Sequence, residues 1–82
     1  MEPTLGQMVH YVLTEEERHR HEGRVAPGLI TRVLDPTAVN ITVFLDGGTT
    51  LYKPEVKLAD KGDKETPGTW FFPRFVLERV TT

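Results

Sequence analysis

Apolar and polar residues alternate in several short runs along this chain, and a period of two is typical of β-strands with one buried face. The clearest run is 39–45 (VNITVFL), in which every odd-numbered residue is Val, Ile or Leu. Residues 7–13 (QMVHYVL) are apolar on both sides, and 29–34 (LITRVL) is rich in β-branched residues. These three runs predict three strands.

Turn residues separate the predicted strands. Asp35 and Pro36 are expected to end the run 29–34, because the residue before a proline is biased away from a helix and Asp-Pro favours turns. Two glycines in Asp46-Gly47-Gly48 supply positive φ and predict a hairpin. Residues 49–52 then form the returning strand, and Pro54 is expected to limit how far it pairs. Residues 75–80 alternate again and predict a final strand.

Two polar segments are predicted to be loops. Residues 14–23 (TEEERHRHEG) contain no apolar side chain, so a helix there would have no face to bury. Thr14 and Glu17 match the Thr-x-x-Glu capping box, and Gly23 suits a helix end, which favours a helical turn within this loop. Residues 57–68 are charged and rich in Gly and Pro, and are expected to be exposed.

The pattern of short strands without an amphipathic helix predicts an all-β fold, a small SH3-like barrel of about five short antiparallel strands. An OB-like barrel is the alternative, although such folds usually need more residues. The 82 residues are expected to form one domain. A domain of roughly 80 residues usually needs a staple, and the chain has no cysteine, so we expect a homo-oligomer.

Charge and hydropathy limit which classes of partner and which cellular location are expected. The 12 acidic and 10 basic residues are interspersed and give a net charge of −2, which argues against strong binding of duplex nucleic acid. Binding of a single strand by local stacking stays open. No apolar stretch approaches the roughly 20 residues of a membrane span, and no secretory signal is evident, so a cytoplasmic location is expected.

Residue types argue against catalysis. The chain has neither serine nor cysteine, and no phosphate-binding loop or dinucleotide fingerprint, so we expect no enzyme activity and no cofactor. His10, His19 and His21 form the only conceivable metal set, but structural zinc sites usually include cysteines. No metal is therefore expected.

The aromatic run Trp70-Phe71-Phe72 contains the best candidate for a binding site. Neighbouring residues of a strand point to opposite faces, so at least one ring faces outward. An outward ring would stack on a base while an arginine held an anion. In the alternative, Trp70 and Phe72 belong to the core and Phe71 covers the barrel end or a subunit contact. The candidate ligand-binding residues are Tyr11, Arg32, Trp70, Phe71 and Arg74.

Four segments carry a resemblance to known proteins: MVHYV at 8–12, GLITRV at 28–33, VNITVFLDG at 39–47 and GTWFFP at 68–73. Together they make the chain similar to a family of short, uncharacterised proteins of bacteriophages and prophages. The resemblance implies a small SH3-like barrel of phage origin and no particular chemistry. The look-alikes often have histidine where Phe71 stands, and many have a shorter tail than 75–82.

Two hypotheses of function follow. In the first, the protein is a non-enzymatic binding module that sequesters a small anionic ligand, such as a nucleotide immune signal of the host. In the second, it is an SH3-like protein-interaction module that inhibits a host protein or belongs to a virion. The second hypothesis predicts that Phe44, Phe71 and Phe75 are exposed on one surface with few basic groups near them.

Overall fold

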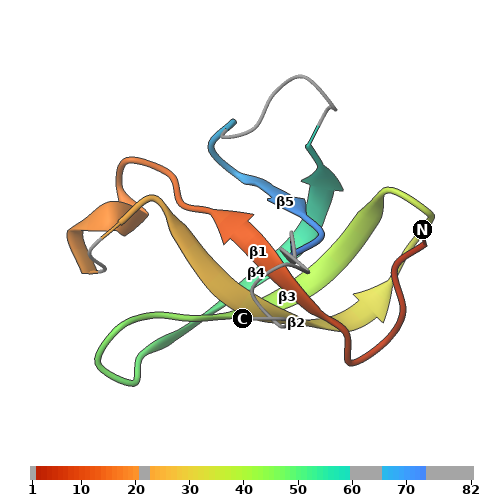
Figure 1. The fold of residues 1–82 in the computed structure, drawn as a ribbon, viewed down its shortest axis with the longest axis horizontal. Helices are drawn as coiled ribbons and strands as arrows, with labels where there is room; N and C mark the ends of the chain where they lie inside the picture. The colour runs from red at the N-terminus through yellow and green to blue at the C-terminus, as the bar shows by residue number, and fades with distance from the viewer. Residues whose placement is uncertain (1, 21–22, 60–65, 74–82) are drawn as a thin grey trace, which may run out of the picture.

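The five described strands of this protein close into one small barrel. A computed structural model describes residues 2–20, 23–59 and 66–73. Around the barrel the order is β1-β2-β3-β4-β5, with β5 next to β1 (Figure 1). The elements are β1 (Met8–Val12), the 3-10 helix η1 (Glu17–Arg20), β2 (Val25–Val33), β3 (Ala38–Phe44), β4 (Thr50–Leu58) and β5 (Thr69–Phe71). The predicted all-β, SH3-like barrel is confirmed.

One pair of strands differs from the antiparallel expectation. β1, β2, β3 and β4 pair antiparallel in sequence order, and β5 pairs antiparallel with β1. β5 is parallel to β4, with Lys57 opposite Thr69 and Leu58 opposite Trp70. A closed ring with an odd number of strands cannot alternate direction at every pair. One parallel pair is therefore a requirement of closing a five-stranded barrel.

The core fills the inside of the barrel, as the alternating pattern of 39–45 predicts. Gly28 also faces inward, and a Cβ there would lie 2.6 Å from Ile41 Cγ2, so only glycine allows β2 and β3 to approach this closely. In the described residues, no buried polar side-chain atom lacks a hydrogen-bond partner. The buried core cluster consists of Val9, Tyr11, Leu13, Ala26, Ile30, Val39, Ile41, Val43, Leu45, Val56 and Trp70.

The hairpin between β3 and β4 follows the prediction. Leu45 N–H donates to Thr49 C=O at 2.7 Å, and Gly48 N–H donates back to Leu45 C=O at 3.3 Å. Gly47 and Gly48 both have φ of 90°, a conformation that side chains with a Cβ rarely adopt. The two glycines therefore let the chain reverse within three residues.

The prediction that Pro54 limits the return strand is wrong, because β4 continues to Leu58. Ile41 pairs with Lys53 and Val39 pairs with Val56, so two residues of β4, Pro54 and Glu55, lie opposite Asn40. This is a β-bulge, which removes the proline from the ladder of hydrogen bonds. Glu55 takes a φ of 50°, and its N–H donates to Asn40 Oδ1 at 2.9 Å.

β2 also begins earlier than predicted, at Val25 instead of residue 29. Pro27 is opposite His10 of β1, and the pairing of β2 with β3 begins one residue later, at Gly28. Pro27 is thus accepted in a strand because only one neighbour pairs with it. The predicted strand 75–80 and Arg74 lie outside the described residues. No helix within the described part of the chain is long and apolar enough to cross a membrane.

Candidate functional site

Two of the predicted ligand-binding residues, Tyr11 and Trp70, lie in the core. They are opposite each other on β1 and β5, and their side chains are fully buried. The Trp70 indole N–H donates to Thr37 C=O at 3.2 Å, and its ring packs edge-on against Phe72 with 4.9 Å between centroids. The alternative that assigned these residues to the core is confirmed for Trp70, whereas Phe72 is partly buried and packs against the core. Stacking on a ligand requires an exposed ring face, which neither Tyr11 nor Trp70 has.

The remaining predicted residues are not brought together with these two. Phe71 is half-buried on the outer side of β5, where its ring meets His10 edge-on at 5.3 Å. Arg32 is exposed on β2, opposite Asn40. Phe71 is opposite His10, and His10 is opposite Pro27. Arg32 lies five positions along β2 from Pro27, which corresponds to roughly 16 Å. Arg32 is therefore not brought together with these aromatic rings.

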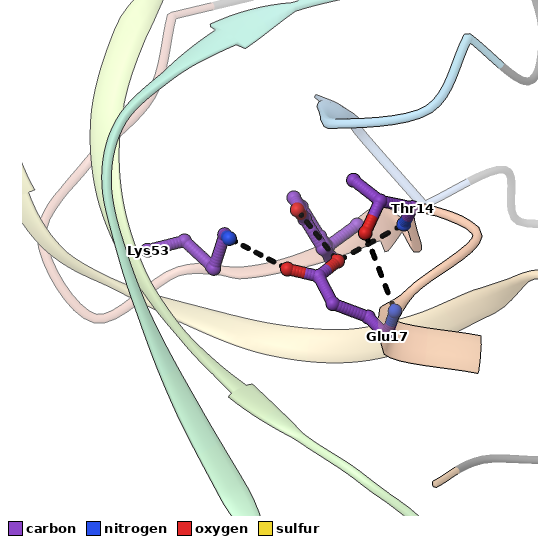
Figure 2. Close-up of polar contacts among 4 residues, drawn as sticks. Thr14, Glu17 and Lys53 are labelled. Carbon is purple, nitrogen blue, oxygen red and sulfur yellow. Dashed lines mark hydrogen bonds and ion pairs between the residues drawn. The ribbon is translucent and has the colours of Figure 1, made fainter. Parts of the chain in front are cut away.

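A polar network joins the loop after β1 to β4, and Figure 2 shows its contacts. Glu17 and Thr14 form the predicted capping box: Thr14 N–H donates to Glu17 Oε1 at 2.9 Å and Glu17 N–H donates to Thr14 Oγ1 at 3.3 Å. The Tyr11 hydroxyl donates to the same Glu17 Oε1 at 3.0 Å, and Lys53 Nζ donates to Oε2 at 2.5 Å. One carboxylate thus connects β1, η1 and β4.

The surroundings of this network keep Glu17 ionised and Tyr11 protonated. Burial alone would raise the pKa of Glu17, but hydrogen bonds from Lys53, the Thr14 N–H and Tyr11 hold it below its ordinary value. The pKa of Tyr11 is raised well above its ordinary value by burial, and also by its hydrogen bond to Glu17 and the charge of that carboxylate. Each group is held in one form by its partners, so we assign the network a structural role.

Metal binding has no support in the part of the chain that the structure describes, where no group of three His, Asp or Glu side chains could hold an ion. The side chain of His19 and the whole of His21 lie outside this part.

The outside of the sheet carries apolar residues in two neighbouring rows. In the first row Met8 is opposite Leu29, Leu29 is opposite Thr42, and Thr42 is opposite Tyr52. In the second row, which lies two residues further along each strand, Phe71 is opposite His10 and His10 is opposite Pro27. The row continues with Phe44, which is opposite Thr50. We call the residues of both rows the outer face: Met8, His10, Pro27, Leu29, Thr42, Phe44, Thr50, Tyr52 and Phe71.

Six of the nine residues of the outer face are exposed, and none of the nine is Lys, Arg, Asp or Glu. Four of its large side chains are strongly exposed: Met8 at 47%, Leu29 at 38%, Phe44 at 40% and Tyr52 at 61%. Charged residues make up 27% of the whole chain, so nine outward positions without one are a marked departure. The centres of protein interfaces are likewise depleted in charge and enriched in Met, Phe and Tyr.

Sequence reasoning missed most of this face. It pointed to Phe44 and Phe71 but not to Met8 or Leu29, which lie side by side on β1 and β2. A signal was present, because 7–13 is apolar on both sides while an ordinary surface strand is polar on one. Which outward residues of different strands lie together depends on the register, and the register is a property of the folded sheet.

The structure is a small SH3-like barrel whose outer face is largely apolar and contains no Lys, Arg, Asp or Glu. Comparisons of the chain with models of protein families, with curated proteins and with solved structures find no match. The resemblance to bacteriophage proteins therefore stays a prediction.

Proposed function

We propose that this protein is a non-enzymatic interaction module that binds a partner protein through its outer face. The observation that carries the proposal is the absence of Lys, Arg, Asp and Glu across two rows of outward residues, four of them large and exposed, in a chain otherwise rich in charge. Large exposed apolar patches are unusual on monomers and often mark interaction sites. The bacteriophage resemblance suggests a host protein or a virion component as the partner.

Met8, Leu29 and Phe44 form the centre of the proposed contact. Met8 and Leu29 are directly opposite each other, so their Cβ atoms lie about 5 Å apart. Phe44 is the diagonal neighbour of Leu29, because Leu29 is opposite Thr42, two residues before Phe44. A partner that covers these three side chains removes them from water, and such burial stabilises a complex by roughly 25 cal/mol per Å² before the costs of association.

The hypothesis of a small anionic ligand has less support. Tyr11 and Trp70 are inside the barrel, and Arg32 lies at a distance from Phe71 along the sheet. Calorimetric titration with cyclic dinucleotides tests this hypothesis directly. Binding that Arg32→Ala abolishes and Leu29→Glu leaves intact would favour it over the proposed function.

Site-specific photo-crosslinking tests the proposed function. A photoreactive amino acid replaces Leu29 on the outer face or, as a matched control, Leu34, which is equally exposed at 41% but follows β2 outside that face. We expect a protein cross-linked through position 29 and not through position 34. With that protein purified, Leu29→Glu should weaken binding at least about tenfold, equivalent to 1.4 kcal/mol, and Leu34→Glu should not. Equal cross-linking from both positions would overturn the proposal.

A further inference from the structure

Among the strands that the structure describes, only one lies beside the first half of β4. β3 pairs with β4 from Thr50 onward, whereas β5 pairs only with Lys57 and Leu58. Along residues 50–56, the structure describes no strand on the second edge. Figure 1 shows the reason, since the hairpin of β3 and β4, in green, extends away from β5. A strand edge with unpaired backbone groups is a template for a further strand.

The register identifies the backbone groups on this free edge. Hydrogen-bonded and non-hydrogen-bonded pairs alternate along an antiparallel ladder. Leu45 and Thr49 are a hydrogen-bonded pair, so Leu51 and Lys53 also direct their N–H and C=O groups toward β3. Thr50 and Tyr52 direct theirs away from β3. Both residues are exposed, and no strand among the described residues pairs with their two donors and two acceptors along this edge.

The free edge is closed to longer pairing at one end. Pro54 is in phase with Thr50 and Tyr52, but it has no N–H to donate. The β-bulge at Pro54 and Glu55 then bends the strand. Natural proteins use prolines and bulges in this way to restrict pairing at an edge. What remains open is a short window, residues 50–52, centred on Leu51.

We propose that a second copy of this chain pairs with residues 50–52 of β4 in an antiparallel, twofold-symmetric dimer. With Leu51 opposite Leu51 of the second copy, Thr50 of each copy faces Tyr52 of the other. Two hydrogen-bonded pairs form, which use the N–H and C=O groups of Thr50 and Tyr52 in both chains. A twofold axis through Leu51 satisfies every open group of the window.

The side chains in the window suit a second copy of the chain. Each Tyr52 lies directly across from a Thr50, and aromatic residues opposite β-branched ones stabilise antiparallel pairs by roughly 0.2–1 kcal/mol. Leu51 is half-buried against the core. In the dimer, Leu51 of the second copy covers its exposed part. Residues 49–52 carry no charge, so no like charges meet near the axis. In a twofold interface each surface must complement itself.

The dimer uses the backbone of Thr50 and Tyr52, two residues of the outer face, but leaves the centre of the contact in the proposed function free. Edge pairing joins two sheets side by side, so Met8, Leu29 and Phe44 remain exposed in both copies. Cross-linking at position 29 thus reports on the outer face, whether or not the chain dimerises. Failure of one proposal leaves the other standing.

Sedimentation velocity from micromolar to millimolar protein tests the dimer. We expect a concentration-dependent dimer for the native chain and for Tyr52→Val, which keeps the backbone N–H. Tyr52→Pro removes that N–H without removing a bond to β3, and we expect it to remain monomeric across the range. A native chain that is monomeric at millimolar concentration, or a Tyr52→Pro variant that dimerises as the native chain does, overturns the proposal.

Amide hydrogen exchange provides a second test that needs no variant. If the dimer forms through this edge, exchange at the Thr50 and Tyr52 amides slows as protein concentration rises. The Thr31 amide serves as the reference on a different strand, and its exchange should not depend on concentration. A dimer whose Thr50 and Tyr52 amides exchange as fast as in the monomer overturns the proposal.

Discussion

Replacing Glu17 by alanine tests the network that joins the loop after β1 to β4. The Glu17 carboxylate accepts hydrogen bonds from Tyr11, Thr14 and Lys53, and its side chain is only 14% exposed. Without it, the Tyr11 hydroxyl loses its acceptor at a buried position. We expect Glu17→Ala to be among the most destabilising substitutions outside the core.

The lost contacts determine how far Glu17→Ala lowers the free energy of unfolding. A buried hydroxyl left without a partner costs about 1–3 kcal/mol, and a lost helix cap costs about 1 kcal/mol. The pair with Lys53 adds little, because Lys53 is 31% exposed and exposed ion pairs contribute at most about 1 kcal/mol. The free energy of unfolding should therefore fall by about 2–4 kcal/mol. For a domain of this size that is a large part of the total stability.

Urea unfolding followed by Trp70 fluorescence measures this change. The matched control is Glu16→Ala, which removes an exposed carboxylate from the same turn and should change stability by no more than about 0.5 kcal/mol. In a double-mutant cycle, Glu17→Ala should cost about 1–2 kcal/mol less when Tyr11 is already Phe, because no hydroxyl is then stranded. Equal losses for Glu17→Ala and Glu16→Ala would refute the reasoning.

The same network predicts how stability responds to acid. The pKa of Glu17 is lower in the folded chain than its ordinary value, so the unfolded chain binds a proton first as the pH falls. Its contribution is complete above the ordinary pKa of a glutamate and is lost as the pH falls through the folded pKa. Glu17→Gln should therefore reduce the loss of stability in acid. Part of the loss of stability in acid remains in this variant, because hydrogen bonds from Thr37 and Ala38 also lower the pKa of Asp35 in the folded chain.

Three further outcomes are expected from the core. Gly28→Ala places a methyl group against Ile41 and should lower the free energy of urea unfolding by about 1–3 kcal/mol. Trp70→Phe removes the hydrogen bond to Thr37 and leaves a cavity, so its melting temperature should fall by several degrees, as for a loss of about 2 kcal/mol. The pKa of Tyr11 is higher in the folded chain, so its contribution is complete below the ordinary pKa of tyrosine and is lost as the pH rises beyond it. Tyr11→Phe should flatten the alkaline fall of stability in a pH series of urea unfolding.

Local patterns predicted the elements whose cause lies within a few residues. The alternation of 39–45 identified the buried side of β3, and the two glycines of 46–48 identified the hairpin. The capping box of Thr14 and Glu17 was predicted from their spacing and is present. Prolines were interpreted too strictly, because strands accept them where only one neighbour pairs, as at Pro27, or where a bulge sets them aside, as at Pro54.

Which of the candidate binding residues are buried could not be predicted from the sequence, for a physical reason. Aromatic residues are common both in cores and on binding surfaces, so the composition of 70–72 does not show which rings are buried. Burial of Trp70 follows from the closing of β5 onto β1, and exposure of Met8 and Leu29 follows from the register of β1 and β2. Both depend on pairing between distant parts of the chain.

The amino-acid sequence by itself determined that this chain forms short strands, which side of β3 is buried, and where the chain reverses, because these properties depend on neighbouring side chains and on backbone preferences. Only the tertiary structure decided that β5 closes the ring parallel to β4, that Lys53 reaches Glu17 across 36 residues, and that the charge-free rows lie together on the outside. Closure, long-range ion pairs and shared surfaces arise from register and curvature. No local pattern contains that information.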